Sequence, residues 1–231
     1  MQARPAITLR YFACRGRAQP LRYALHDAGV TYDDELVPFD ASWVECKQDP
    51  SFSGPFASLP VLVWGDVVLA QTPAIAYFLA RTLELGGDGS DLAMARALAL
   101  CTFGLEDFAA PIFGVLWQPG EYSAESVRAA RDGARVRLAP RVTRLEAWLQ
   151  DAAPYALGER PCIGDYFLWE GVDVAIRVIG PSLIEAAPAV RAWFDRMAAR
   201  PRLAAYIASG ARPAKLCGSM VEDEILALLA E

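Results

Sequence analysis

The chain has 231 residues, of which 54% are hydrophobic and 22% are charged, a composition typical of a folded globular protein. That length suits one large domain or two small ones. The formal net charge of −6 disfavours a general role in binding nucleic acids or anionic membranes, because both attract positively charged surfaces.

The amino-terminal third has the pattern of an α/β unit. Alternating apolar residues predict a strand over residues 6–12, and a helical pattern follows over residues 18–29. Gly29 stands where the C-terminal cap of that helix belongs. A second, weaker strand is expected over residues 30–39.

The next segment is typical of a β-hairpin followed by a helix. Two apolar runs within residues 59–71 flank Gly65-Asp66, a pair suited to a two-residue turn. The helix over residues 72–85 has clear start signals, because Thr72 suits the N-cap and Pro73 the first helical position.

Residues 83–91 are rich in glycine and acidic residues and are expected to be a linker, after which the patterns turn helical. Helices are predicted over residues 91–117, 123–151, 165–179 and 188–209. The predicted fold class is therefore α/β plus all-α, with an α/β domain over residues 1–83 and an all-helical domain over residues 92–212. An amphipathic tail over residues 213–231 follows.

Other features bear on location and cofactors. No apolar run reaches the length of about 18 residues that a membrane-spanning helix needs. The amino terminus also lacks the apolar core of a signal peptide. The five cysteines have no metal-binding spacing and His26 is the sole histidine. We therefore expect reduced thiols in a cytoplasmic protein that binds no metal.

Tyr11 ends the first predicted strand and lies near Arg17 in the sequence. Its phenol can donate a hydrogen bond to an anion, and a thiolate held in this way has a lowered pKa. The alternative is a core tyrosine with its hydroxyl at the edge.

Two further pairs also have a functional and a structural interpretation. Trp43 and Lys47 lie four residues apart, so that on a helix they share a face and suit a carboxylate. Alternatively, the ring shields the lysine stem. Leu59-Pro60 either exposes strand backbone to an extended peptide or simply begins a strand.

Gln71 and Thr72 stand at a predicted helix start, which is either an anion site or an ordinary cap. Taken together, these signals describe one site with a thiol activator, open strand backbone and two places for carboxylates. Such a site fits a small, extended thiol peptide with two carboxylates.

These stretches resemble the cytosolic glutathione S-transferases over nearly the whole chain, and the tyrosine type close to the sigma class in particular. The sequence YFACRGRAQPLRYAL (11–25) is similar to the family's Tyr-Phe-x-x-Arg-Gly-Arg-Ala-Glu-Pro-x-Arg stretch. The sequence SLPVLVWGDVVLAQTPAIAYFLA (58–80) is similar to its Leu/Ile-Pro-x-Leu and Gln-Ser-x-Ala-Ile stretches. The resemblance implies a thioredoxin-like domain followed by a helical bundle domain, glutathione as co-substrate and a homodimer.

By this resemblance, Tyr11 stabilises the glutathione thiolate and Arg17 supports its charge. The resemblance implies glutathione contacts from Trp43, Lys47, Ser58, Leu59, Pro60, Gln71 and Thr72. The first two hold the glycine carboxylate, the backbone of the leucine before a cis proline pairs with the cysteinyl unit, and the last two bind the γ-glutamyl end.

The sequence departs from the family pattern in three ways. Ser58 replaces a longer Gln or Lys. Ala99 and Phe103 stand where related classes carry an acid that completes the other subunit's site, so we expect a modest affinity for glutathione. Cys162 replaces the Ser or Thr of a capping box with Asp165, a loss on the order of 1 kcal/mol.

An apolar pocket for the acceptor substrate is expected between the domains, and Arg15 is expected to face solvent. The expected pocket residues are Phe12, Cys14, Phe103, Asp107 and Phe108.

The leading hypothesis is a detoxifying transferase that conjugates glutathione to hydrophobic electrophiles, with peroxidase and isomerase activity as variants of the same chemistry. Two alternatives stay open. One is a non-catalytic binding or structural protein with the same fold, and the other is a thiol transferase that depends on Cys14.

Overall fold

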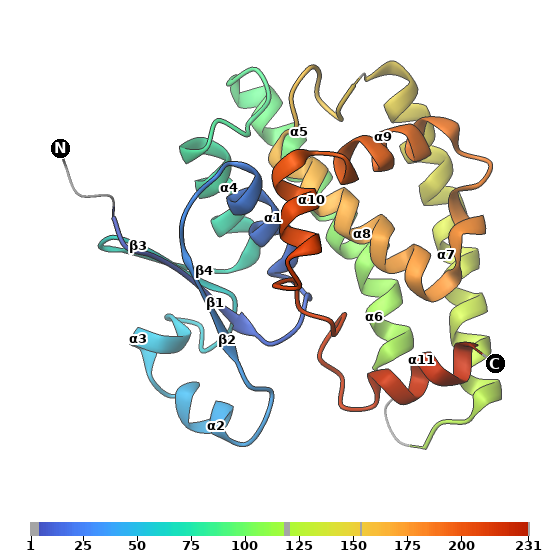
Figure 1. Ribbon diagram of the computed structural model, residues 1–231, viewed down its shortest axis with the longest axis horizontal. Helices are drawn as coiled ribbons and strands as arrows, with labels where there is room; N and C mark the ends of the chain where they lie inside the picture. Colours follow the sequence, from blue (N-terminus) through green and yellow to red (C-terminus); the bar gives the residue numbers. More distant parts are fainter. Residues whose placement is uncertain (1–4, 118–120, 153, 231) are drawn as a thin grey trace.

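The computed structural model describes residues 5–117, 121–152 and 154–230. Within these ranges, the amino-terminal part holds a four-stranded sheet with helices, and the remainder is helical (Figure 1). The predicted fold class, an α/β domain followed by an all-helical one, is confirmed. The domain boundaries at residues 83 and 92 stay a prediction.

The sheet has the strand order β2-β1-β3-β4. Its strands are β1 (Ile7–Phe12), β2 (Asp33–Val37), β3 (Val61–Trp64) and β4 (Val67–Ala70). Strand β1 runs parallel to β2 and antiparallel to β3, and β3 pairs with β4 across the predicted Gly65-Asp66 turn. The helices α1 (Gln19–Asp27) and α4 (Thr72–Thr82) pack towards the helical domain.

The start of α4 differs from the prediction by one position. Thr72 is the first helical residue, and Gln71 occupies the N-cap position with a φ of 74°. The Thr72 side chain therefore does not cap the helix, although Pro73 still lies in the first turn. Two short helices, α2 (Ser42–Cys46) and α3 (Pro50–Ser53), also connect β2 to β3.

The helical domain follows the predicted pattern with one added break. Its helices are α5 (Asp91–Thr102), α6 (Ala110–Leu116), α7 (Ala124–Asp151), α8 (Ile163–Ile179), α9 (Pro188–Ala198), α10 (Pro201–Ala208) and α11 (Glu222–Ala230). The helix predicted over residues 188–209 is in fact two, because Pro201 begins a new helix after Arg200. A π-helical segment, Phe103–Ala109, joins α5 to α6.

Helix α8 is the centre of the core and approaches this π-helical segment very closely. A side chain at Gly104 would place its Cβ only 2.5 Å from the backbone of Phe167, and one at Gly171 would lie 2.5 Å from the Gly104 carbonyl oxygen. Real Cβ atoms are essentially never found so close to backbone atoms. Glycine at both positions therefore lets the two helix backbones meet.

The capping box of α8 keeps its geometry despite the cysteine at position 162. The Asp165 carboxylate accepts hydrogen bonds from the backbone N–H groups of Cys162 (2.8 Å) and Ala156 (3.0 Å) and from the Trp193 indole (2.7 Å). Burial raises the pKa of Asp165, although these hydrogen bonds oppose the shift. Asp165 therefore fastens the loop before α8 and the helix α9 to the start of α8.

The sequence Asp91–Leu116 contradicts the expectation that no segment is long and apolar enough to cross a membrane. By length and composition alone, this helix meets that requirement. Such a helix is weak evidence for a membrane span, because buried core helices of soluble proteins meet the same test. Here 44% of the apolar window is buried, and the helix packs against α8.

Candidate active site

The predicted site residues gather at one end of the sheet because of its strand register. Arg10 of β1 lies opposite Val61 of β3, and Val61 lies opposite Ala70 of β4. The neighbouring residues therefore meet at the same end of the sheet, where Tyr11 follows Arg10, Pro60 precedes Val61 and Gln71 follows Ala70. The segment carrying Trp43 and Lys47 leaves β2 at this end as well, since Val37 lies opposite Phe12.

The Tyr11 hydroxyl is held in place by backbone. The side chain is 8% exposed, and its oxygen accepts a hydrogen bond from the Arg17 backbone N–H at 3.1 Å. Burial raises the pKa of Tyr11 to about 12, an effect opposed by the Arg17 N–H and the charges of Arg17 and Arg22. The phenol therefore keeps its proton at neutral pH, and no described residue accepts it, so the hydroxyl is free to donate to a ligand.

Gly16 lies directly against this hydroxyl. Its φ of +42° suits glycine, and a Cβ there would lie 2.5 Å from the Tyr11 oxygen. The loop between β1 and α1 can approach the phenol only because residue 16 has no side chain.

Two arginines place positive charge near Tyr11. Arg17 is half exposed and pairs with Glu106 at 2.8 Å, from the π-helical segment. Arg22 is fully buried, lies 5.9 Å from the centre of the Tyr11 ring, and donates to the Cys14 carbonyl at 2.8 Å. Its Nε also pairs with Asp34 at 2.9 Å. Sequence reasoning missed Arg22, although the helical spacing that placed it on α1 was available.

Aromatic rings connect Tyr11 to the helix α2. The Phe12 ring makes edge contacts with Tyr11 at 5.5 Å and with Trp43 at 5.1 Å between centroids. The Lys47 backbone N–H donates to the Trp43 carbonyl at 2.8 Å, which confirms the helical spacing of this pair. Their role as carboxylate ligands stays a prediction.

The other predicted glutathione contacts lie on the β3–β4 side. The Leu59-Pro60 peptide bond is cis, as the resemblance implied. The Gln71 amide donates to the Ser58 hydroxyl at 3.3 Å, so the two polar side chains expected at this end are in contact. Thr72 is 3% exposed at the start of α4. The shorter Ser58 thus supports the Gln71 side chain.

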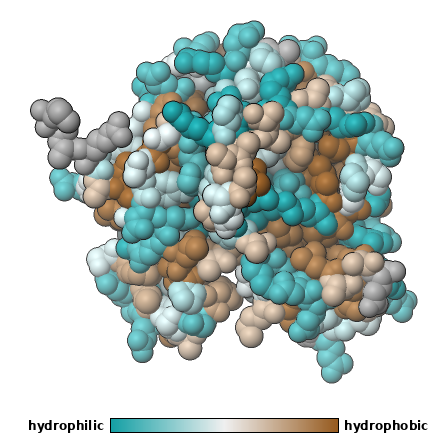
Figure 2. Space-filling model, viewed as in Figure 1, coloured by the Kyte–Doolittle hydropathy of each residue, from teal (hydrophilic) through white to brown (hydrophobic). Residues whose placement is uncertain are grey.

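A cavity of about 360 Å³ lies next to the Tyr11 loop. Its lining residues are Phe12, Ala13, Cys14, Phe39, Lys215, Gly218, Ser219 and Met220. Figure 2 shows the molecule hollowed at its lower edge, between the two halves, with hydrophobic side chains on both sides. Phe12 and Cys14 thus line a cavity between the amino-terminal domain and the tail.

The three helical residues expected in this pocket are not among those that line this cavity, and the role of the two partly exposed ones, Phe103 and Asp107, stays a prediction. Phe108 is fully buried and packs against Phe103 with ring centroids 5.3 Å apart, and Asp107 pairs with Arg141 at 3.3 Å. None of the three lines the cavity beside Cys14. Phe108 of the π-helical segment therefore packs in the core, whereas Asp107 stays 40% exposed.

The environment of Cys14 does not activate its thiol. The side chain is 2% exposed, and burial raises its pKa to about 12, with the charges of Glu222 and Glu170 adding to the shift and Arg22 opposing it. Redox-active cysteines have the opposite properties, namely a lowered pKa and access to solvent.

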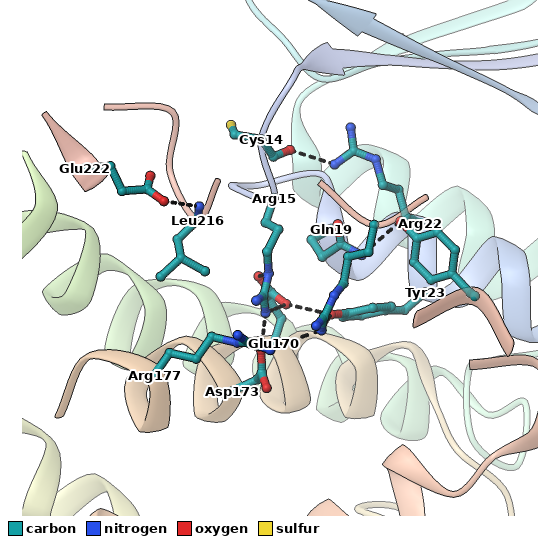
Figure 3. A network of polar contacts seen from close by, with 12 residues as sticks. Cys14, Arg15, Gln19, Arg22, Tyr23, Glu170, Asp173, Arg177, Leu216 and Glu222 are labelled. Carbon is teal, nitrogen blue, oxygen red and sulfur yellow. Dashed lines mark hydrogen bonds and ion pairs between the residues drawn. The ribbon is translucent and has the colours of Figure 1, made fainter. Parts of the chain in front are cut away.

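The expectation that Arg15 faces solvent is wrong. Its guanidinium is 1% exposed and forms a two-point ion pair with Glu170 of α8, at 3.0 and 2.7 Å. Asp173 accepts a further hydrogen bond, and the Tyr23 hydroxyl donates to Glu170 at 3.1 Å (Figure 3). The local sequence does not reveal this pairing, because Glu170 lies 155 residues further along the chain.

Comparisons with known proteins agree with this geometry. Residues 7–81 match the family model described as glutathione S-transferase, N-terminal domain, and residues 106–210 match glutathione S-transferase, C-terminal domain. The chain is 29% identical to glutathione S-transferase P of Homo sapiens over 205 residues, or 89% of this chain and 93% of that protein. It is 27% identical to glutathione S-transferase P of Caenorhabditis elegans over 201 residues, or 87% of this chain and 91% of that one.

A solved structure of the Pi-class glutathione S-transferase of Onchocerca volvulus has the same fold, with a TM-score of 0.77, 24% identity, and coverage of 93% of this chain and 100% of that one. The expected closeness to the sigma class stays a prediction, since these relatives are of the Pi class or named P. With both of its domains matched and its fold shared, the chain belongs to the cytosolic glutathione S-transferase family of enzymes.

Proposed function

We propose that the enzyme binds glutathione as a thiolate held by the Tyr11 hydroxyl and conjugates it to hydrophobic electrophiles. The observation that carries this proposal is the Tyr11 hydroxyl itself: its oxygen accepts from the Arg17 N–H at 3.1 Å, which leaves its proton for a ligand. A hydrogen bond to the thiolate favours the charged form over the thiol and lowers the thiol pKa. The sulfur lone pair then forms the bond to the electrophilic carbon, and the displaced group leaves with the bonding electrons.

Glutathione would lie across the end of the sheet where Tyr11, Pro60 and Gln71 meet. Its cysteinyl backbone would pair with Leu59, and its glycine carboxylate would reach Trp43 and Lys47. The γ-glutamyl end would lie at the start of α4, where backbone N–H groups and the helix dipole favour negative charge. Gln71, held by Ser58, would bond this end of the peptide.

The acceptor substrate would occupy the cavity beside Cys14, Phe12 and Phe39. Its lining combines the apolar side chains of Phe12, Phe39 and Met220 with Lys215 and Ser219, and the apolar part suits a hydrophobic electrophile. The same thiolate would attack the terminal oxygen of a hydroperoxide, which forms an S–O bond, breaks the O–O bond and releases the alcohol. The thiol of a second glutathione would then attack the sulfur of the resulting sulfenic acid, which gives the disulfide and releases water. Proton transfer from a bound substrate would give isomerase activity at the same place.

The direct test is a pH titration of the ultraviolet thiolate absorbance of glutathione bound to the enzyme. We expect the bound thiol to ionise well below the pKa of free glutathione. Binding with an unshifted pKa would favour a non-catalytic binding protein instead, and no binding would contradict the proposed site.

Replacing Cys14 with serine is expected to leave the rate of conjugation within about threefold of wild type. The Cys14 thiol has a pKa raised to about 12 and is almost fully buried, so it contributes packing rather than a nucleophile. Steady-state kinetics with a chromogenic electrophile and with a glutathione mixed disulfide would separate the two activities. Loss of disulfide exchange with retained conjugation would establish the Cys14 thiol transferase as a second activity.

A homodimer in the cytoplasm, serving detoxification, is the setting we propose for this activity. Exposed apolar side chains on β4, α4, α5 and the loop before β3 support the dimer, because a partner subunit could cover them. They are Phe56 (63% exposed), Val68 (48%), Tyr77 (49%) and Leu92 (61%). Light scattering after gel filtration should give a mass near twice 25.1 kDa, and a mass near 25.1 kDa would contradict the proposed homodimer.

A further inference from the structure

The segment between α10 and α11 crosses the loop that carries the active site. We call residues 212–221 the strap and residues 13–18 the site loop. In Figure 1 the strap runs down between the two halves of the molecule, from α10 to α11. The Arg15 N–H donates to the Lys215 carbonyl at 2.9 Å, and the Gly16 N–H donates to the Leu216 carbonyl at 2.8 Å. The strap thus pairs with the site loop through two backbone hydrogen bonds.

A buried carboxylate fixes the shape of the strap. Glu222 is 1% exposed and accepts hydrogen bonds from three consecutive backbone N–H groups, those of Leu216 (2.6 Å), Cys217 (2.9 Å) and Gly218 (3.2 Å). Figure 3 shows the Glu222 side chain pointing at the Leu216 nitrogen. The N–H of Leu216 is thereby held by Glu222 while the carbonyl of the same residue holds Gly16.

The other end of the strap is anchored in the ion network between the domains. Arg212 donates to the Tyr23 hydroxyl at 3.3 Å and lies 3.8 Å from the Asp173 carboxylate. The strap is therefore held at Arg212 and, through Glu222, at residues 216–218, and residues 215–216 contact the site loop.

The contact reaches the Tyr11 hydroxyl in one further step. Gly16 lies so close to this hydroxyl that a Cβ would be 2.5 Å from its oxygen, and the next residue, Arg17, donates its N–H to that oxygen. Any shift of Gly16 therefore shifts the atoms that surround and orient the phenol. A misplacement of about 1 Å at a catalytic group can cost as much as about 100-fold in rate.

We propose that Glu222 is a positioning residue for catalysis: it shapes the strap, the strap holds the backbone of Arg15 and Gly16, and this loop holds the Tyr11 hydroxyl where it meets the thiolate. This inference rests on the proposed function of Tyr11. It predicts that Glu222, about 200 residues from Tyr11 in the sequence, changes the ionisation of bound glutathione without touching it.

The test compares wild type with Glu222→Gln, which keeps the size of the side chain and replaces one acceptor oxygen with a donor. We expect the Arg15 and Gly16 amides to exchange hydrogen about 10- to 100-fold faster in the variant, while amides of α8 keep their protection. We also expect kcat to fall about tenfold and the pKa of bound glutathione to rise, while KM for glutathione stays within about twofold, because Trp43, Lys47 and Gln71 do not contact the strap.

Asp223→Asn is the matched control. Asp223 is the next residue on the same helix and pairs with the side chain of Lys215 at 2.5 Å rather than with strap backbone, and it is 77% exposed. This variant is expected to behave as wild type in all three measurements. Glu222→Asp, which keeps the charge on a shorter side chain, is expected to lie between wild type and Glu222→Gln, and it serves as the deciding variant if Glu222→Gln loses protection in α8.

The two hypotheses fail in different ways. A wild-type enzyme that leaves the glutathione pKa unshifted would contradict the proposed function, whatever the amides show. A wild-type enzyme with a lowered pKa, together with a Glu222→Gln variant of unchanged pKa and kcat, would overturn the positioning role even if the two amides exchange faster.

Discussion

Replacing Tyr11 with phenylalanine is expected to raise the pKa of bound glutathione by about one to two units. A hydrogen bond to a charged group contributes about 1.5–3 kcal/mol, and one pKa unit corresponds to about 1.4 kcal/mol. At a pH below both values, the fraction of thiolate falls by the same factor, so the rate of conjugation should drop about 10- to 100-fold. Because burial raises the pKa of Tyr11 to about 12, the phenol keeps its proton near neutral pH and can donate to the thiolate there.

The pH dependence of the loss identifies its cause. Glutathione is ionised in both enzymes above the raised pKa, so the deficit of the Tyr11→Phe enzyme should shrink as the pH rises. The measurement is the thiolate absorbance of bound glutathione, together with kcat/KM over the same pH range. A variant that titrates as wild type, or a deficit that is constant with pH, would contradict the role of Tyr11.

Tyr32→Phe provides the matched control for this substitution. The Tyr32 hydroxyl is buried and makes no hydrogen bond to any described residue. It lines a separate cavity of about 1010 Å³ at the opposite end of β1, which contains none of the predicted site residues. Removing this hydroxyl should leave both the glutathione pKa and the rate unchanged.

Replacing Arg15 with methionine is expected to lower the free energy of unfolding by about 3–5 kcal/mol. The change leaves the Glu170 carboxylate, which is 1% exposed, without its cation, and an uncompensated buried charge is strongly destabilising. Chemical denaturation followed by tryptophan fluorescence would measure the loss. Arg131→Met is the control, because Arg131 pairs with Asp132 at the surface, where such pairs contribute at most about 1 kcal/mol.

A double variant and the pH dependence test the same explanation. The loss of unfolding free energy in Arg15→Met combined with Glu170→Gln should be smaller than the sum of the two single losses, because no carboxylate at position 170 is then left unpaired. Additive losses would contradict a coupled ion network.

The pH dependence of stability tests the same network at Asp173. Burial opposes ionisation of Asp173, but Arg15 and Arg177 outweigh it and hold the Asp173 pKa below its ordinary value of 3.8. The stability from this shift is present above pH 3.8 and is lost as the pH falls through the lowered pKa, so it should be smaller in the Arg15→Met protein. Equal losses at low pH in wild type and Arg15→Met would contradict this role of Arg15.

Local signals in the sequence predicted the sheet and one end of the site well. The Gly65-Asp66 turn, the proline in the first turn of α4 and the alternation of β1 depend on neighbouring residues, so their structural consequence is already visible in a short stretch. These elements set the strand register, and the register brings Tyr11, Pro60 and Gln71 together at one end of the sheet.

The errors arose where partners lie far apart in the chain. Arg15 looks like a loop arginine until α8 supplies Glu170, and Phe108 looks like a pocket aromatic until the π-helical segment turns it into the core. The sequence did not indicate a special role for Glu222, because acidic residues are common in the first turn of a helix. Its function in the fold depends on backbone donors of the strap, and backbone geometry has no signature in side-chain pattern.

The pairing of the strap with the site loop also has a consequence for synthesis of the protein. Arg15 and Gly16 leave the ribosome about 200 residues before Lys215 and Leu216, whose carbonyls they bind. At about 5–20 residues per second, the nascent chain spends roughly 10–40 s without these acceptors. An amino-terminal domain that folds during translation therefore lacks these two backbone contacts to its site loop until residues 215 and 216 have been synthesised.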